Sequence, residues 1–389
     1  MSAAGPSQGA RPLRGRRAQR AAGDYCLSAA GPATVMITTG GTGGHVFPGL
    51  AVAHKLVARG ARVFWLGTHG GMESRLVPQH GVDFEGLDFR GVRGKGLRTL
   101  LLGPFALAAA CIASARVLKR RKPDVVIGFG GFASFPGALM TAATRVPLLL
   151  HEANAIAGLA NRILAYGADR LLVGFPDAFR GRHRRIVEFT GNPLRDEMVS
   201  LPPPGERFAG REGPLRLLVV GGSLGAQALN ECVPAALARL PVERRPRVVH
   251  QAGARHQAVL AERYAHYGVE AECVAFIDDM AARYAWADFV VCRGGALTVA
   301  ELAAVGLGAL IVPLPGAIAD EQTANARYLV DAGGATCIRQ DRLDAATLAD
   351  LVAGLTRERA LALAVAARAV GRHDAAVRIA EACLAAGAR

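Results

Sequence analysis

The sequence lacks the cysteine spacing of a disulfide scaffold or of a structural zinc site. Its seven cysteines are scattered through 389 residues, odd in number and free of any C-x-x-C pair. This pattern indicates a reducing compartment. Aromatic residues make up only 6% of the chain, whereas 51% of the residues are apolar. The composition excludes a disordered chain and favours buried parallel strands with small-residue turns.

Acidic residues are absent from the first 23 positions, which carry five arginines and contribute to a net charge of +14. A run of this kind is typical of a solvated, disordered arm, and attraction to an anionic surface is the alternative. Neither an RNA-binding module nor a helix-turn-helix signature follows, so we expect an anionic membrane surface as partner and no nucleic acid. The arginines precede no continuous apolar stretch, which argues against a secretory signal.

One uncharged apolar stretch, residues 99–115, needs a check for membrane spanning. It is short for a span, carries Gly103-Pro104 near its start and leads directly into the strand-like run KPDVVIGFGG. We therefore expect a buried or interfacial helix. Its rim of Arg98, Arg116 and the basic residues 119–122 would let it lie on an anionic leaflet.

Short apolar runs alternate with helical stretches, which is the pattern of parallel α/β layers. A glycine cluster follows a strand in each half, at Gly40–Gly44 and at Gly221–Gly225. We therefore expect two similarly wound domains, joined near the Pro202–Gly205 cluster. The expected strands are 34–39, 62–67, 124–129, 147–152 and 170–175, then 215–220, 247–252, 273–278, 288–293 and 309–314.

The two glycine turns are candidate ligand sites, with plain packing as the alternative. Glycines let the backbone approach a ligand, and the helix that follows directs free N–H groups and its positive dipole end at an anion. A nicotinamide dinucleotide is not expected, because the second strand ends FWLGTHGG with no acidic residue before Glu73 to hold a ribose. Neither turn continues as G-K-[ST], so a P-loop is excluded as well.

Metal-ligand patterns are also missing from the sequence. No Asp-x-Asp occurs, and HEANA at His151 fails the H-E-x-x-H pattern because residue 155 is alanine. We expect no metal and no cofactor. A released diphosphate would then be stabilised by helix ends and by Arg195, whose fork of donors suits a pyrophosphate; a surface ion pair is the alternative role for this arginine.

Polar residues near the ends of predicted strands complete the candidate site. His45 follows the first glycine turn directly, and Glu152 and Asn154 follow the apolar run PLLL. His45 is either a reacting group or the first polar residue of a buried helix. Thr298 and Glu301 have the spacing of a capping box. The alternative places Glu301 on the first turn of a helix, where its carboxylate accepts from both hydroxyls of a ribose.

Long motifs in the chain resemble one bacterial family, the peptidoglycan N-acetylglucosaminyltransferases of the MurG type. The resemblance covers nearly everything from Ala33 to the C-terminus and leaves out the arginine-rich tail. It rests on GGTGGHVFPGLAVA, GFGGFASFPG, HEANAIAGLANR, GNPLR, VVGGSLGA, FIDDMAARYAWADFVVCRGGALTVAEL and DEQTANA, in that order.

The resemblance implies a GT-B fold of the α/β class, with two Rossmann-like domains facing across a cleft and a last helix that returns to the first domain. The corresponding boundaries are a basic tail at 1–30, an N-terminal domain at 31–190, a C-terminal domain at 191–365 and a helix at 366–389. It implies UDP-N-acetylglucosamine as donor and the undecaprenyl-pyrophosphoryl N-acetylmuramyl-pentapeptide as acceptor. The enzyme would act as a peripheral protein on the cytoplasmic face of the inner membrane and form a β-1,4 link with inversion.

The resemblance also implies roles for individual residues. His45 is the expected general base for the acceptor hydroxyl, with Glu152 as the alternative base. Glu301 is expected to bind the ribose, and the backbone of Ile277 the uracil. The expected donor contacts are Thr42, Gly43, Gly44, Asn154, Arg195, Ser223, Ile277, Ala296, Leu297, Thr298, Val299, Ala300, Glu301 and Gln322.

Several positions depart from the usual family pattern: Ala153, Leu224, Gly316, Ala319 and Glu321. They affect the expected details of sugar recognition and leave the expected fold unchanged. Two other functions stay open from the residues alone. One is a nucleotide-sugar epimerase on the same scaffold, and the other is a non-enzymatic scaffold that uses the basic tail.

Overall fold

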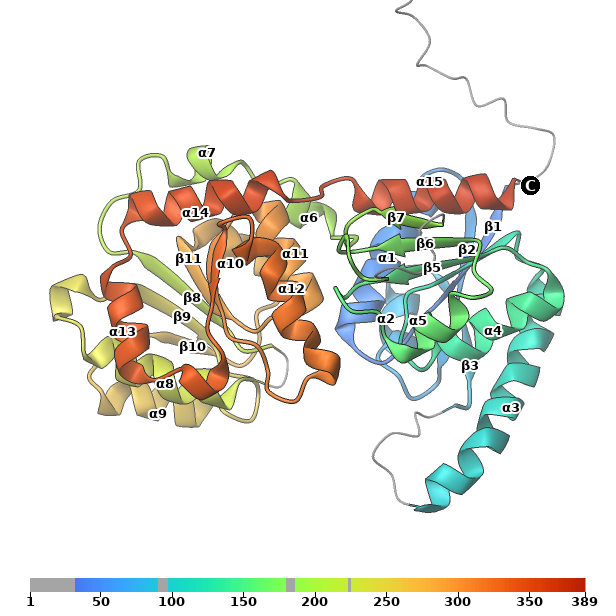
Figure 1. Cartoon of the computed structure of the whole chain (residues 1–389), viewed down its shortest axis with the longest axis horizontal. Coiled ribbons are helices and arrows are strands. Elements are labelled where there is room, and N and C mark those ends of the chain that lie inside the picture. The colour runs from blue at the N-terminus through green and yellow to red at the C-terminus, as the bar shows by residue number, and fades with distance from the viewer. Residues whose placement is uncertain (1–31, 90–96, 180–185, 223–224, 389) are drawn as a thin grey trace, which may run out of the picture. The chain divides into compact units, whose positions relative to one another are not determined.

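The computed structural model describes residues 32–89, 97–179, 186–222 and 225–388 (Figure 1). Within these ranges every strand pairs in parallel with its neighbours, in two sheets. The predictions for residues 1–30, for Ser223 and for Leu224 lie outside the described residues.

The first sheet has the order β3-β2-β1-β4-β5-β6-β7. Its strands are β1 (Thr34–Thr38), β2 (Arg62–Thr68), β3 (Asp83–Leu87), β4 (Val125–Gly128), β5 (Leu148–Glu152), β6 (Arg170–Val173) and β7 (Val187–Phe189). The helices that follow these strands are α1 (Gly43–Val57), α2 (Glu73–Gln79), α3 (Leu97–Arg121), α4 (Ser134–Thr144) and α5 (Leu159–Leu164). We call this sheet and its helices the first domain.

The second sheet repeats the winding, with the order β10-β9-β8-β11-β12-β13. Its strands are β8 (Arg216–Val220), β9 (Arg247–Gln251), β10 (Glu272–Val274), β11 (Phe289–Cys292), β12 (Gly308–Ile311) and β13 (Ala335–Cys337). Its helices are α8 (Gln227–Ala238), α9 (Gln257–His266), α10 (Met280–Trp286), α11 (Ala296–Val305), α12 (Glu321–Val330) and α13 (Ala345–Ala353). We call this sheet and its helices the second domain; the short helices α6 (Asp196–Val199) and α7 (Pro204–Phe208) precede it.

The central strands are buried on both faces, as expected for parallel sheets covered by helices. In β1, Val35 and Ile37 belong to one core cluster and Met36 to the opposite one. All three side chains are fully buried. Strand β11 is also buried along its whole length. The apolar runs in the sequence therefore form the central strands, because a strand covered by helices must bury the side chains of both of its faces.

All ten predicted strands are present, with ends shifted by a few residues. Three further strands, β3, β7 and β13, were not expected. Each lies at an outer edge of its sheet, where only one neighbour supplies hydrogen bonds. Two of them have three residues each, and β3 contains Asp83, Glu85 and Gly86. Their apolar signal is weak because an edge strand buries less surface.

The last two helices pack on different sheets. Helix α14 (Arg357–Ala369) contacts α11 and β12 of the second domain. Helix α15 (Ala375–Gly387) contacts α1, β1 and β4, and its Ile379 and Cys383 are fully buried in the core of the first domain. The exact domain boundaries at residues 30, 190 and 365 stay predictions.

Candidate active site

The first glycine turn connects β1 to α1, as the sequence predicted. Thr42 is the N-cap residue of α1 and has an extended backbone, and Gly43 and Gly44 are the first helical residues. Thr42 and Gly44 are exposed. The turn thus presents a helix N-terminus to solvent at the carboxyl end of a central strand, where α/β proteins bind ligands.

A buried carboxylate lies beneath this turn. Glu73 accepts hydrogen bonds from the backbone N of Gly41 at 3.2 Å and from the backbone N and Oγ1 of Thr68 at 3.0 and 2.8 Å. A Cβ on Gly40 would lie 2.2 Å from Glu73 Oε1 and 2.8 Å from Ala133 Cβ, so a larger residue would displace the buried carboxylate. Sequence reasoning treated Glu73 only as an acid placed too late to bind a ribose, and missed this support of the turn.

His45 is the third residue of α1 and is partly exposed. Its Nδ1 lies 3.3 Å from Thr42 Oγ1. The other edge of the ring faces Gly130, where a Cβ would lie 3.6 Å from His45 Nε2. Gly130 has a φ of +82°, which glycine adopts without strain. Burial lowers the pKa of His45, so its imidazole is neutral at pH 7 and able to accept a proton.

Glu152, at the end of β5, is engaged on both of its oxygens. Oε1 accepts from Asn154 N at 3.0 Å and from its Nδ2 at 3.4 Å. Oε2 accepts from Gly158 N at 3.0 Å and from Asn161 Nδ2 at 2.9 Å. Burial raises the pKa of Glu152, and these hydrogen bonds act in the opposite direction. The side chain is 4% exposed, so this carboxylate organises the loop that carries Asn154.

Asn325 on α12 links this loop to the second domain. Its Oδ1 accepts from Ala155 N at 2.8 Å, and its Nδ2 donates to Asn154 Oδ1 at 3.2 Å and to Gly294 O at 3.1 Å. Asn325 is fully buried, and a buried amide with this many partners is costly to replace. The link places Asn154 beside the turn that begins α11. Sequence reasoning missed Asn325 and Asn161, although both lie inside the motifs DEQTANA and HEANAIAGLANR.

Helix α11 corrects two expectations about Thr298 and Glu301. The helix begins at Ala296 with Gly295 as its N-cap residue, and Gly295 has no side chain to form a cap. Thr298 is therefore the third helical residue, and the capping-box interpretation is wrong. Glu301 is the sixth helical residue, so its predicted place on the first turn is also wrong. The free N–H groups at the start of α11 remain available to a ligand.

Glu301 instead contacts a residue that the sequence did not single out. Tyr284 OH on α10 donates to Glu301 Oε2 at 3.1 Å. Burial raises the pKa of Glu301 to about 7, while the positive charge of Arg195 and the Tyr284 hydrogen bond lower it. Arg195, the N-cap residue of α6, also lies over the ring of Phe47 on α1, 5.6 Å from its centroid. One arginine thus contacts the first domain and influences a carboxylate of the second.

The remaining predicted donor contacts surround these groups. The side chains of Ile277 and Val299 are buried, so a ligand could reach only their backbone. Ala296, Leu297, Thr298 and Ala300 are partly exposed along the first turns of α11. Gln322 on α12 is partly exposed, and its Oε1 accepts from Leu314 N at 2.9 Å.

The described positions that depart from the usual family pattern lie in two places, directly after β5 and directly before or at the start of α12. Ala153 is buried, and its carbonyl accepts from Asn192 Nδ2 at 3.0 Å. Gly316, Ala319 and Asp320, in the loop before α12, have positive φ values of 73°, 53° and 57°. Only the first of these is a glycine, so the loop holds two non-glycine residues in the left-handed region directly before Glu321 and Gln322.

Comparison with known proteins identifies the family. Residues 35–173 match the N-terminal domain of glycosyltransferase family 28, and residues 216–379 match the C-terminal domain of that family. The UDP-N-acetylglucosamine–N-acetylmuramyl-(pentapeptide) pyrophosphoryl-undecaprenol N-acetylglucosamine transferase of Nitrosospira multiformis is 52% identical over 351 residues, which cover 90% of this chain and 98% of that protein. The enzyme of the same name from Burkholderia thailandensis is 53% identical over 358 residues, covering 91% and 96% of the two chains.

A solved structure agrees with these matches. The crystal structure of MurG from Acinetobacter baumannii superposes with a TM-score of 0.78 and 36% identity, covering 91% of this chain and all of that one. The two Rossmann-like domains therefore form a GT-B fold, as the resemblance implied. The chain belongs to glycosyltransferase family 28 and, within it, to the family of UDP-N-acetylglucosamine–N-acetylmuramyl-(pentapeptide) pyrophosphoryl-undecaprenol N-acetylglucosamine transferases.

Proposed function

We propose that this protein transfers N-acetylglucosamine from UDP-N-acetylglucosamine to the 4-hydroxyl of undecaprenyl-pyrophosphoryl N-acetylmuramyl-pentapeptide, and so makes lipid II from lipid I. Family membership supports the substrates. The observation that carries the mechanism is the hydrogen-bonded link Asn154–Asn325–Gly294, which joins the end of β5 to the start of α11. Because this link holds the end of β5 beside the start of α11, one ligand can contact both domains.

The donor is placed mainly by the second domain in this proposal. Glu301 accepts from the ribose hydroxyls, and the backbone of Ile277 binds the uracil. The diphosphate lies at the N-terminus of α11, where free N–H groups and the helix dipole favour negative charge. Arg195 adds a positive charge there. Asn154 and the first glycine turn reach the sugar from the first domain.

The acceptor hydroxyl attacks C1 of the sugar from the face opposite the diphosphate. The new C1–O bond forms as the bond to the diphosphate oxygen breaks, so the configuration at C1 inverts and UDP leaves with the electron pair. His45 takes the hydroxyl proton on Nε2. This step uses the tautomer that carries its proton on Nδ1, where Thr42 Oγ1, 3.3 Å away, can accept it. His45 is favoured over Glu152 as the base because both oxygens of Glu152 already accept hydrogen bonds.

A transfer assay tests the function as a whole. Pure protein with radiolabelled UDP-N-acetylglucosamine and a short-chain lipid acceptor is expected to move label into the lipid fraction, dependent on acceptor. A variant without residues 1–30 is expected to retain this activity in detergent. Isomerised sugar from donor alone would favour the epimerase. Abolition of turnover by removing the tail from a folded protein would favour the basic scaffold.

Replacing Glu301 by alanine is expected to weaken UDP binding roughly 10- to 100-fold, because hydrogen bonds to a charged group contribute about 1.5–3 kcal/mol. Isothermal titration calorimetry with UDP measures the change. Glu262→Ala, an exposed glutamate on α9, is the matched control and should bind UDP normally. Unchanged UDP affinity in folded Glu301→Ala protein would remove Glu301 from the donor site.

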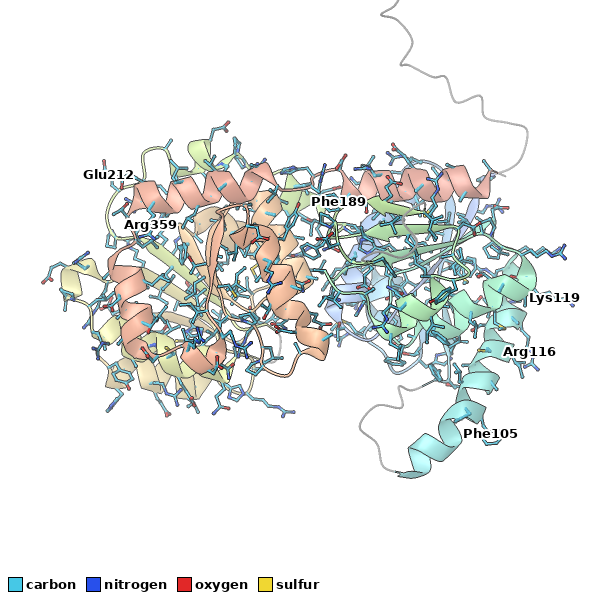
Figure 2. All side chains as sticks on the ribbon, viewed as in Figure 1. Phe105, Arg116, Lys119, Phe189, Glu212 and Arg359 are labelled. Atoms are coloured by element: carbon cyan, nitrogen blue, oxygen red, sulfur yellow. The ribbon has the colours of Figure 1, made fainter. Side chains whose placement is uncertain are left out.

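The acceptor lies in a membrane, and α3 offers a surface for it. Phe105 is 75% exposed and Ile112 is 54% exposed, and exposed Arg116 and Lys119 follow along the same helix (Figure 2). An apolar stretch next to basic side chains suits an anionic interface. None of the helices in the described ranges is long and apolar enough to cross a membrane. We propose peripheral attachment to the cytoplasmic face of the inner membrane.

Replacing Phe105 by serine is expected to lower partitioning onto vesicles that contain anionic phospholipid. The loss is roughly 10-fold or more, since burying a phenylalanine contributes about 1.5–3 kcal/mol. Co-sedimentation with vesicles measures it. Val365→Ser, at a 53%-exposed residue of α14, is the control and should bind as the wild type does. Equal binding by both variants would place the membrane contact elsewhere.

A further inference from the structure

Tyr284 is a buried residue whose hydroxyl meets the candidate donor site. The side chain is 1% exposed and belongs to the core of the second domain. A buried phenol needs a hydrogen-bond partner, and here the partner is Glu301 Oε2 at 3.1 Å. Among the described residues, Tyr284 is the one hydrogen-bond donor to the Glu301 carboxylate. Oε1 of this carboxylate is therefore left for a ligand.

The backbone under Glu301 is fixed at both ends of α11. At the C-terminal end, Arg207 donates to the carbonyls of Val305 and Gly306. Arg368 and His373 contact the carbonyl of Ala304, with Arg368 Nη1 and His373 Nε2 at 2.9 and 2.8 Å.

At the other end, Asn325 Nδ2 binds the carbonyl of Gly294, which directly precedes the N-cap residue Gly295. Arg207 and Arg368, at the C-terminal end of α11, also interact favourably with the negative end of the helix dipole. The remaining freedom of Glu301 is therefore rotation of its own side chain.

We propose that Tyr284 is a positioning residue for the nucleotide: it holds Oε2 of Glu301 so that Oε1 faces the ribose. This inference rests on the proposed donor site and assigns to α10 a part in it. A glutamate has three rotatable side-chain bonds, and ordering them costs free energy on binding. A carboxylate that is already held spares the ligand this cost.

The groups around Glu301 make the role measurable by pH. Tyr284 faces it from α10, Cys292 from β11 and Arg195 from the N-cap of α6; Arg368 on α14 instead binds carbonyl groups of α11. Burial raises the pKa of Glu301 to about 7, and the Tyr284 hydrogen bond lowers it. UDP binding that needs the carboxylate should therefore weaken as the pH falls through 7. Loss of the Tyr284 hydroxyl should move this midpoint to higher pH.

Calorimetric titration with UDP between pH 6 and 9 tests the inference. Tyr284→Phe is expected to weaken UDP binding about 5- to 10-fold at pH 7, with the midpoint displaced upward. Tyr264→Phe is the matched control, because Tyr264 is also buried and its hydroxyl lies 3.0 Å from His250 Nδ1. It should keep the wild-type pH profile, whatever its melting temperature.

A double-mutant cycle separates this inference from the proposed function. If Tyr284 acts through Glu301, Tyr284→Phe should have no further effect in the Glu301→Ala background. Weakened binding in Glu301→Ala but a wild-type profile in Tyr284→Phe would overturn the inference alone. No effect of Glu301→Ala would overturn the donor site itself. Equal displacement of the profile in Tyr264→Phe would show general destabilisation and also overturn the role of Tyr284.

Discussion

Replacing His45 by alanine is expected to lower kcat for sugar transfer by about 10²- to 10⁴-fold, the usual contribution of a general base. UDP affinity should change little, because in our proposal the imidazole receives a proton from the acceptor hydroxyl. Alanine is a good helix former, so α1 should remain intact. Steady-state transfer kinetics and UDP calorimetry on the same preparation measure the two quantities.

The control for this prediction lies on the same helix. His54 is exposed on α1, and His54→Ala should transfer sugar at the wild-type rate. In the wild type, burial lowers the pKa of His45. At saturating donor, kcat should therefore stay constant from neutral pH to just below the ordinary histidine value of about 6.5, and fall only at more acidic pH. Turnover within a few-fold of the wild type in His45→Ala would leave the reaction without its proposed base.

Replacing Asp288 by alanine is expected to lower the free energy of unfolding by about 3–5 kcal/mol, the cost of removing one partner from a buried ion pair. Asp288 is fully buried, accepts from Arg216 N at 3.0 Å and pairs with the guanidinium groups of Arg211 and Arg357. Arg211 is itself 8% exposed. Without the carboxylate, this arginine would keep a buried charge with no counter-ion beside β11.

Urea unfolding followed by circular dichroism measures the loss. Asp341→Ala is the control, since Asp341 is 67% exposed and its pair with Arg339 is a surface contact; such pairs contribute about 0–1 kcal/mol. If Asp288→Ala were no less stable than Asp341→Ala, the buried pairing of Asp288 with Arg211 and Arg357 would not stabilise the fold. Because Asp288 lies outside the proposed site, any folded Asp288→Ala protein should retain UDP binding.

Local patterns in the sequence were good predictors of the central strands of both sheets. Runs such as VMI and FVVC are apolar on successive residues, as a strand must be when helices cover both of its faces. The glycine turn at Gly40–Gly44 was also predictable, because a strand, small residues and a helix follow directly in the chain. The edge strand β7 escaped because its three residues, Val187–Phe189, include a glutamate and form no apolar run, whereas the equally short edge strand β10 adjoins the apolar run CVAF.

The sequence named the candidate residues of the site but could not show how they are connected. The motifs contained His45, Glu152, Asn154 and Glu301, and family resemblance supplied their expected roles. The spacing of Thr298 and Glu301 suggested a cap, and the structure shows that α11 starts two residues before Thr298. Glu152 was expected as the alternative base, and the structure shows that both of its carboxylate oxygens accept hydrogen bonds. Spacing cannot report a hydrogen bond made by a partner far along the chain.

The sequence alone therefore determined the parallel α/β class, the first glycine turn and the family, because each depends on residues adjacent in the chain. Only the tertiary structure decided which polar groups meet. Asn325 reaches Asn154 across 171 positions, and Tyr284 reaches Glu301 across 17. The reason is physical: buried polar atoms must find partners wherever the folded chain supplies them, and the fold, rather than the order of residues, brings those partners together.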